Sequence, residues 1–440
     1  MVNTLKRYYL GVLLILCLLL AGCNPPGSAE AITLKLAVFG EREISSSELS
    51  KWVHQYNENN PEVIIEMVNY AENSLDSVEA LNQIKIEIAA GKGPDIINFN
   101  NLRYSPLDAS CGILADIYPF MEKDESFNKE DFYFNIIDSF LIGENLYILA
   151  PSYRIASFTT VNNNFLGLER FTVNKLIDAY NTKEDDAILF PGETKMAVLG
   201  MICYKSMENF VDWDKGICQF DSVNFKEILH FANRFPLHLN FADDHSVMEY
   251  FTEGRAILYP ASISNVFDTA MLRTLYGETP VYIGYPLDSG NGNMAEIADI
   301  AIGISSTSRN KDEAWMFIKS LLESEFQDNI QNGLPLSIIS LEKKLAEAME
   351  IEYDLNGDKI VREQIRFEGE VPIDIYMINN EDAEMLKSII RKVEFNGEID
   401  STIYGIMLEE ADYMFNDNRN ADDVAEIIQN RASIYVNESK

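Results

Sequence analysis

Segments with the pattern of β-strands alternate with segments with the pattern of helices between residues 33 and 99, and this order restricts the fold more than any other feature. Apolar runs at 33–39, 63–68 and 94–99 have the length of buried strands. The intervening segments repeat apolar residues at helical spacing, the first after the capping sequence Ser45-Ser46-Ser47-Glu48. Such alternation predicts a parallel sheet covered by helices, with a ligand crevice beyond the carboxyl ends of its strands. The loops after residues 39 and 99 are therefore expected to face a crevice.

The first 23 residues have the pattern of an export signal. Lys6 and Arg7 precede an apolar run at 10–20, which is shorter than the roughly 20 residues that a membrane-spanning helix needs. The following Leu20-Ala21-Gly22-Cys23 resembles the bacterial lipobox. We therefore expect a signal peptide at 1–22, lipid attachment at Cys23 and a tether at 23–31. The alternative is an ordinary secreted protein with a chance cysteine at that place.

Charge and length narrow the class of protein. The chain has 70 acidic and 35 basic residues, a formal net charge of −35, which disfavours nucleic acid and anionic membrane surfaces as partners. Contact with a membrane is expected only through the lipid anchor. A hydrophobic content of 47% is typical of a folded protein, and 440 residues exceed what one core usually supports. These features predict two lobes.

Three cysteines remain beyond the signal and the lipidation site, so at most one disulfide can form within the chain. Cys203 and Cys218 are the pair nearest in sequence, and Cys111 would then be left over. An equally good interpretation is that all three are small buried apolar side chains.

Motifs for cofactors and metals are weak. The glycine-rich run at 290–295 is followed by no helical pattern, unlike a dinucleotide-binding loop. The run Asp354-Leu355-Asn356-Gly357-Asp358 resembles the start of a calcium loop, but its sixth position is Lys359 and its twelfth is Ile365. A hairpin turn at Asn356-Gly357 is the better prediction. The four histidines lack a zinc spacing, so no cofactor and no metal site are expected.

A run at 89–96, Ala-Ala-Gly-Lys-Gly-Pro-Asp-Ile, resembles a signature of bacterial extracellular solute-binding proteins of family 1, the type that serves sugar ABC importers. Further segments are similar to this family in the same order, and together they extend from about residue 32 to 438. These segments lie at 114–120, 143–151, 251–259, 300–322 and 430–438.

The resemblance implies a periplasmic-binding-protein-like α/β fold with two α/β lobes and a ligand cleft between them. Lobe 1 would comprise 32–150 plus 285–330 and lobe 2 would comprise 151–284 plus 331–440, with crossings near Pro151, Tyr285 and Gln331. It further implies a monomer on the outer face of the cell membrane, which binds a small solute, most often a carbohydrate. The lobes would close by hinge bending, and the partner would be the membrane subunits of an ABC importer.

Loop positions within the resemblance supply the candidate ligand-binding residues, because a sugar needs flat apolar partners and hydrogen-bonding groups. At least one of the four aromatic candidates is expected to stack on the ligand. Core packing is the alternative role for Phe99, Tyr259 and Tyr404, and a solvated or paired charge is the alternative for the ionic candidates. The candidates are Glu41, Arg42, Phe99, Asn100, Asn101, Tyr153, Arg154, Glu193, Tyr259, Ser262 and Tyr404.

Two other classes of function stay open at this stage. A lipid-anchored glycoside hydrolase or lyase would need a pair of carboxylates, but 70 acidic residues make some pair inevitable and no particular pair informative. A lipoprotein that senses a ligand without feeding a transporter is the other alternative. The ligand's identity and size are not encoded in any motif.

Overall fold

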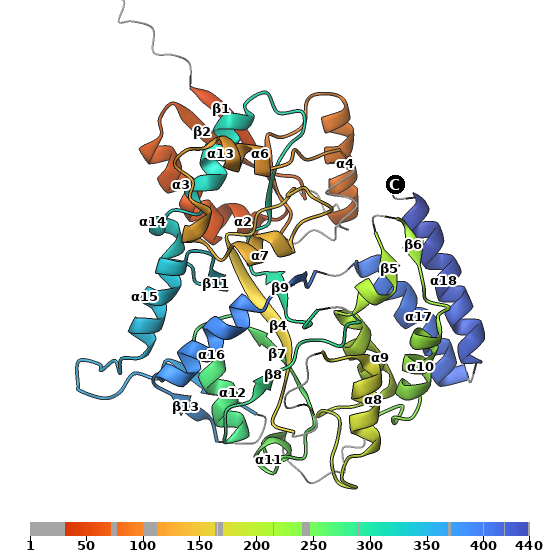
Figure 1. Cartoon of the computed structure of the whole chain (residues 1–440). Helices are drawn as coiled ribbons and strands as arrows, with labels where there is room; N and C mark the ends of the chain where they lie inside the picture. Colours follow the sequence, from red (N-terminus) through yellow and green to blue (C-terminus); the bar gives the residue numbers. More distant parts are fainter. Residues whose placement is uncertain are drawn as a thin grey trace, which may run out of the picture.

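The computed structural model shows two α/β lobes that lie one above the other in Figure 1 and meet at the start of strand β4 (Ser152–Thr160). Cys23, Asn101 and Cys111 lie outside the described part of the chain. The structure describes residues 31–71, 77–100, 112–162, 165, 170–213, 215–239, 247–288, 290–367, 371–398, 400–417 and 419–438.

Lobe 1 is built on a four-stranded sheet in the order β10-β3-β1-β2. Strand β1 pairs in parallel with β2 and β3, as the alternation of strands and helices predicts, and β10 joins β3 antiparallel. Leu36 and Val38 of β1 belong to one hydrophobic cluster and Ala37 to another, so both faces of the sheet are covered. The strands are β1 (Ile32–Val38), β2 (Val63–Asn69), β3 (Ile96–Asn98) and β10 (Ile302–Ile304).

Helices cover this sheet on both sides. The predicted apolar stripe of α3 is buried, but the capping residue is Ser47, whose side chain accepts from Ser50 N–H, rather than Ser45. Ser45 instead ends the short helix α2. The helices of lobe 1 are α2 (Glu41–Ser45), α3 (Glu48–Asn59), α4 (Ser77–Ala89), α6 (Tyr118–Lys123), α7 (Phe134–Ser139), α13 (Lys311–Ser320) and α14 (Ser324–Gln327).

The run at 89–96 is the connection from α4 to β3, and its residues serve this turn. Gly91 has a left-handed φ of 69°, and a Cβ at Gly93 would lie 2.5 Å from Ile88 Cγ1. Asp95 accepts hydrogen bonds from Lys35 N–H (3.0 Å) and from the Ser308 hydroxyl (2.6 Å). The motif therefore fixes β3 against β1 and against the turn that follows β10.

Lobe 2 has a six-stranded sheet in which the long strand β4 is central. Strands β7, β8, β9 and β11 each pair antiparallel with β4, while β14 pairs in parallel with β9. Two separate hairpins lie outside this sheet: β5 (Val211–Asp212) with β6 (Ile217–Cys218), and β12 (Glu363–Ile365) with β13 (Ile373–Ile375). The strands around β4 are β7 (Tyr259–Ile263), β8 (Val281–Tyr282), β9 (Met294–Ile297), β11 (Leu334–Pro335) and β14 (Phe395–Asn396).

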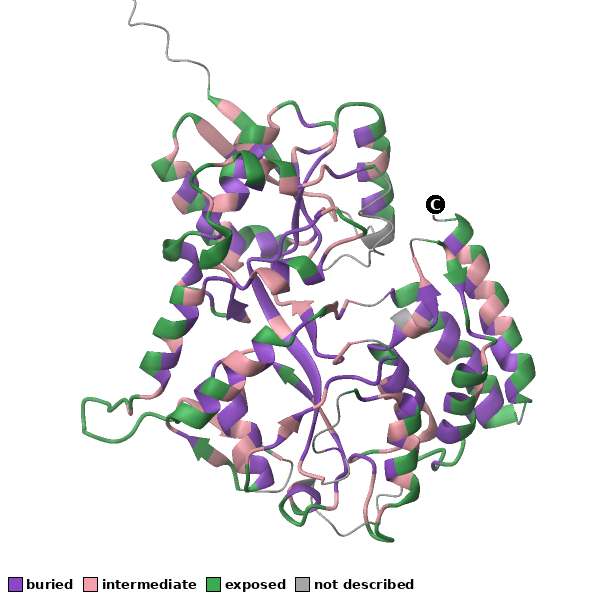
Figure 2. Ribbon diagram, in the orientation of Figure 1, coloured by how far each residue is buried: buried purple, intermediate pink, exposed green. Residues whose placement is uncertain are grey.

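The helices of lobe 2 surround its sheet, and buried residues concentrate along both sheets (Figure 2). The apolar side chains of the last helix, α18, such as Val424 and Ile428, are buried. The helices are α8 (Val173–Asn181), α9 (Lys195–Tyr204), α10 (Val223–Ala232), α11 (Val247–Thr252), α12 (Asp268–Tyr276), α15 (Ile338–Ala348), α16 (Asn380–Arg391), α17 (Ser401–Asp417) and α18 (Ala421–Glu438).

Two boundaries differ from the expectations. The chain returns to lobe 1 only between Ile297 and Ile302, because β8 and β9 still pair with β4, so the crossing does not lie near Tyr285. Tyr285 N–H instead donates to Gly292 O at 2.8 Å, a contact within lobe 2. The resemblance to the family implies a strand at 251–259, but α11 ends at Thr252 and β7 begins only at Tyr259.

The run from Asp354 to Asp358 forms the hairpin turn that the sequence predicts. Asp354 accepts from the N–H groups of Asn356 (2.8 Å) and Asp358 (2.9 Å), and Tyr353 bridges to Lys359, which confirms the hairpin turn. Cys203 and Cys218 are buried free thiols. Within the described residues no helix is long and apolar enough to cross a membrane, and no cluster of three or more potential ligands could hold a metal ion.

Candidate functional site

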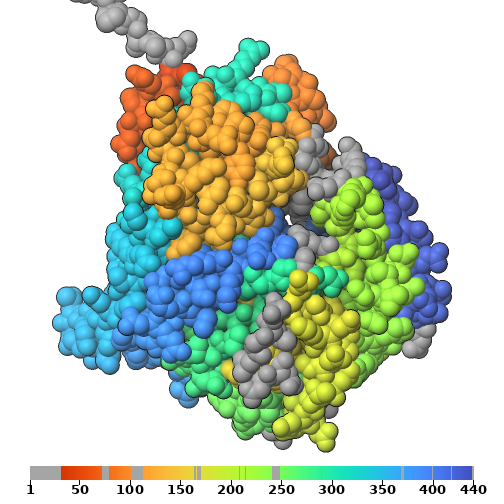
Figure 3. All heavy atoms as spheres, viewed as in Figure 1, coloured from red at the N-terminus to blue at the C-terminus, as the bar shows by residue number. Residues whose placement is uncertain are grey.

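A cavity of about 340 Å³ lies where the lobes meet, and both lobes contribute to its wall. In the space-filling view this face of the molecule is hollowed between the segments near residues 140, 210 and 396 (Figure 3). Lobe 1 supplies the end of α7 and the turn after it, and lobe 2 supplies the end of α9, the β5–β6 hairpin and the segment after β14. The lining residues are Ser139, Leu141, Ile142, Gly143, Tyr204, Lys205, Met207, Val211, Asp212, Trp213, Asn396, Gly397, Glu398 and Asp400.

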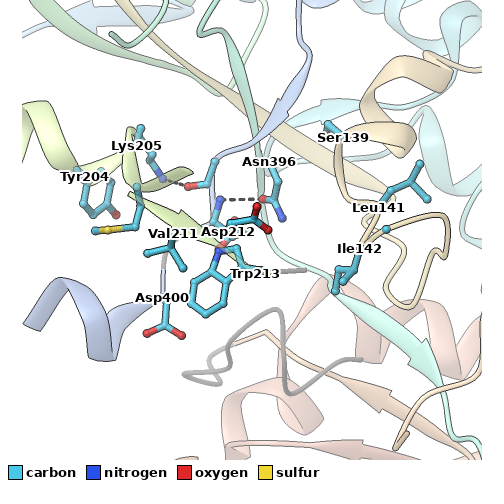
Figure 4. Close-up of a pocket in the computed structure, with 14 residues that line it drawn as sticks. Ser139, Leu141, Ile142, Tyr204, Lys205, Val211, Asp212, Trp213, Asn396 and Asp400 are labelled. Carbon is cyan, nitrogen blue, oxygen red and sulfur yellow. Dashed lines mark hydrogen bonds between the residues drawn. The ribbon is translucent and has the colours of Figure 1, made fainter. Parts of the chain in front are cut away.

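Two aromatic side chains belong to the lobe 2 wall. Tyr204 is the last residue of α9 and is 37% exposed. Its ring packs edge-on against Tyr404 of α17, with centroids 5.3 Å apart. Trp213 follows β5 in the short hairpin and is half-buried. In Figure 4, Leu141 and Ile142 of lobe 1 lie across the cavity from Tyr204 and Val211. The cavity thus combines flat apolar surfaces with hydrogen-bonding groups.

The charged groups of the cavity are held by specific partners. Lys205 Nζ lies 2.5 Å from Glu296 Oε1, donates to Gly397 O and sits 4.3 Å above the centre of the Tyr204 ring. Glu398 accepts from Ile297 N–H at 2.8 Å, and burial raises the pKa of its carboxyl group.

Asp400 caps the start of α17. Its carboxylate accepts from the N–H groups of Thr402 (3.0 Å) and Ile403 (2.9 Å) and from the Tyr435 hydroxyl (2.9 Å). Asn396 accepts from Glu398 N–H at 2.8 Å. Polar side chains thus hold the backbone of Glu398 and of the first turn of α17.

A second group of polar residues connects the lobes near the crossing after β9. Arg154 donates to Ala298 O at 3.0 Å, and Asn100 donates to Asp299 at 3.3 Å. Burial raises the pKa of Asp299, while Arg154 opposes that shift. A smaller cavity of about 160 Å³ lies here, lined by Arg42, Glu43, Ser46, Ser47, Leu49, Asn98, Asn100, Asp299 and Ile300.

The structure therefore brings three of the predicted site residues to the junction of the lobes, namely Arg42, Asn100 and Arg154. Glu41 is exposed in the first turn of α2 and lines neither cavity. Asn101 lies outside the described residues. Arg42 follows β1 and Asn100 follows β3, so both reach the junction from the carboxyl ends of neighbouring parallel strands.

The four aromatic candidates line neither of these two cavities. Phe99 is 1% exposed and Tyr153 is fully buried, so both pack in the core rather than face the cleft. Tyr259 begins β7 opposite Thr159, at the end of β4 away from the crossing, and its ring packs on Phe251. Tyr404 lies behind Tyr204, where its hydroxyl would contact a Cβ at Gly200, and it does not line the cavity.

Two polar candidates are also displaced from the cleft. Glu193 bends back on its own loop, where it accepts from Leu189 N–H at 2.5 Å, and burial raises its pKa to about 7. Ser262 is exposed on β7, opposite Ala156 of β4. Neither residue lines the cavity of about 340 Å³ or the cavity of about 160 Å³.

Sequence reasoning missed most of the residues that line the larger cavity. Trp213 lies in the β5–β6 hairpin, and the sequence does not show that this hairpin faces lobe 1. Tyr204, Lys205 and Glu398 carry no motif. Their position depends on where α9 and β14 end relative to the other lobe, which is a property of the tertiary structure.

No protein-family model matches the sequence, and no curated protein matches it. Solved structures match over most of the chain. The chain is similar to a periplasmic oligogalacturonide binding protein from Yersinia enterocolitica, with 12% identity, 93% of this chain and 100% of that chain covered, and a TM-score of 0.57.

Two further matches have 13% identity. The sugar-binding protein MalE from Xanthomonas citri gives a TM-score of 0.54, with 92% of this chain and 98% of that chain covered. An extracellular solute-binding protein of family 1 from Alicyclobacillus acidocaldarius gives 0.53, with 93% and 99% covered. Two designed esterases also match. The periplasmic-binding-protein-like fold predicted from the sequence is confirmed.

Proposed function

We propose that this protein captures a small carbohydrate between its lobes, outside the cell, and delivers it to an ABC importer. One observation carries the proposal: the larger cavity has walls from both lobes and combines Trp213 and Tyr204 with polar groups such as Asn396. A pyranose offers apolar C–H faces and a rim of hydroxyl groups, and this combination is complementary to it. The sugar-binding proteins that share the fold support the same class of ligand.

Closure of the two lobes around the ligand would give the bound protein a shape that the importer can distinguish from the open form. A ligand that touches Ile142 on one side and Trp213 on the other stabilises only the closed arrangement of the lobes. A shift from 1:99 to 99:1 in favour of the closed form needs about 5.5 kcal/mol of differential binding. A micromolar affinity corresponds to about 8.2 kcal/mol and is sufficient. The hinge would comprise the three crossings, near 151, between 298 and 301, and near 331.

We further propose that the protein acts outside the cell and is held there by a lipid anchor. Export and lipidation at Cys23 would place the lobes at the outer face of the membrane, joined to it by residues 23–31. The cleft would then be presented to solutes outside the cell and the closed form to the importer. We assign no catalytic step to the cavity.

A ligand screen tests the proposal. A soluble form that begins at Asn24 is heated with a panel of mono- and oligosaccharides, and a true ligand raises the unfolding midpoint because it binds only the folded state. Calorimetry then measures the affinity, and mass spectrometry of the recovered ligand shows whether it is intact. An intact sugar with a micromolar or tighter dissociation constant supports the proposal. A panel without a hit contradicts it, and a cleaved sugar moves the protein to the glycoside hydrolases or lyases.

A further inference from the structure

The positive charge in the larger cavity is already neutralised. Lys205 is 6% exposed, and its ammonium group is held by Glu296, by Gly397 O and by the face of the Tyr204 ring. An ammonium group has three donors, and these partners use them. A ligand carboxylate in the cavity would therefore meet a cation that is already paired with Glu296.

Arg154, the other cation near the junction, is engaged in the same way. Its guanidinium group donates to Ala298 O, and the charges of Asp299 and Glu398 lie close enough to act on it. Arg154 does not line the larger cavity. An anionic ligand would thus gain little from this group.

The three carboxylates at the cavity differ in how far they are engaged: Asp212 pairs with Lys215 and Asp400 caps α17, whereas Glu398 accepts one hydrogen bond. Asp212, Glu398 and Asp400 line it together with the single cation Lys205. Among the hydrogen bonds of the described residues, the Glu398 carboxylate accepts only from Ile297 N–H, although a carboxylate has about four acceptor sites. Glu398 is also largely withdrawn from water, so its remaining acceptor sites are best filled by ligand donors.

From this arrangement we infer that the cleft accepts neutral and amino sugars and rejects uronic acids, with Glu398 as the main determinant of this selection. The inference rests on the proposed function. Hydroxyl and ammonium groups donate hydrogen bonds to the Glu398 carboxylate, whereas a uronate would place a second carboxylate beside it. Like charges in a partly buried site repel strongly, so such a site selects by excluding the wrong charge.

Matched sugars test the inference. Calorimetry on the soluble protein uses the disaccharides of glucose, glucosamine and glucuronate and the corresponding disaccharides of galactose, galactosamine and galacturonate. In the series that binds, we expect the uronate to bind at least about 100-fold more weakly than the neutral sugar, a difference of about 2.8 kcal/mol. A uronate that binds as tightly as its neutral counterpart overturns the inference and leaves the proposed function standing.

Two variants test whether Glu398 causes the selection against uronates. Glu398→Gln keeps the shape and the acceptor for Ile297 N–H but removes the charge, and it should reduce the uronate penalty at least tenfold. Glu426→Gln, on the exposed side of α18, is the matched control and should leave the penalty unchanged. An unchanged penalty in Glu398→Gln, with an unfolding midpoint like that of the parent protein, removes Glu398 from its role. If no sugar of either series or of the wider panel binds, the proposed function fails and this inference fails with it.

Discussion

Lys205 Nζ lies 2.5 Å from Glu296 Oε1 and joins the end of α9 to strand β9 beneath the larger cavity. The side chain of Lys205 is 4% exposed and that of Glu296 is 18% exposed. Water therefore reaches both charges poorly, and each charge is compensated mainly by the other. A buried ion pair adds little net stability compared with apolar residues, but the loss of one partner leaves an uncompensated charge.

Removal of Lys205 alone should therefore destabilise the protein. We expect Lys205→Met to lower the free energy of unfolding by about 3 kcal/mol, measured by urea denaturation, because Glu296 is left buried without its cation. The double variant Lys205→Met/Glu296→Leu should recover most of this loss. The control Lys215→Met breaks an exposed pair with Asp212 and should change stability by less than about 1 kcal/mol. A double variant as unstable as the single one would contradict this view of the pair.

Trp213 should contribute directly to ligand binding. We expect Trp213→Ala to weaken the affinity for the neutral sugar found in the screen by at least about tenfold, because the ring offers the flattest apolar surface of the cavity wall. Tyr413→Ala is a control, since Tyr413 is 38% exposed on α17 and does not line the cavity. Equal affinities in a folded Trp213→Ala variant and in the parent protein would exclude stacking on this residue.

The stability of lobe 2 should depend on pH through Glu193. Burial raises the pKa of Glu193 to about 7 from an ordinary value of 4.5, so the folded state holds this proton more tightly than the unfolded state. Both states are protonated below pH 4.5 and both are ionised above pH 7. The destabilisation therefore develops as the pH rises through this window.

The variant Glu193→Gln isolates this effect, because Gln also accepts from Leu189 N–H. At pH 4 the variant and the parent should have similar free energies of unfolding. At pH 8 the variant should be more stable by roughly 2 kcal/mol. The full shift from 4.5 to about 7 would correspond to about 3.4 kcal/mol at about 1.36 kcal/mol per pKa unit, and the expected difference is smaller because the group is partly solvated. A difference between the two proteins that is the same at both pH values would disprove the raised pKa.

Lipid attachment is tested at the proposed anchor. The Leu20-Ala21-Gly22-Cys23 sequence predicts that Cys23 carries the lipid, so Cys23→Ala should release the protein from the membrane fraction of the cells. Cell fractionation followed by immunoblotting measures the distribution. Firm membrane association of the variant, with cleavage at the same bond, would show that Cys23 is not the anchor.

Much of the fold could be predicted from the sequence because strand and helix patterns are local. The run at 33–99 indicates the parallel core of lobe 1, and the stripe of α3 is buried as predicted. The membership of β9 in the second sheet could not be predicted, since its pairing partner Ile155 lies far away in the sequence. Long-range pairing leaves no periodic signal in either strand.

The site could be predicted only in part, for a reason that two adjacent residues illustrate. Tyr153 and Arg154 were both expected at the cleft, but successive side chains of a strand point to opposite faces. The structure places Tyr153 in the core and Arg154 beside Asp299 near the crossing. After the end of β3, Phe99 is likewise buried in the core, whereas the Asn100 side chain donates to Asp299. Sequence position identifies the loop, but the tertiary structure decides which side chain reaches the ligand.

The central claim is that a sugar closes the two lobes around itself, and small-angle X-ray scattering tests it most directly. The radius of gyration of the soluble protein is measured alone and with a saturating concentration of the sugar whose binding calorimetry has established. Because that sugar is proposed to contact both walls of the cavity, from Ile142 to Trp213, we expect a smaller radius in the complex. An unchanged radius with the site fully occupied would contradict it.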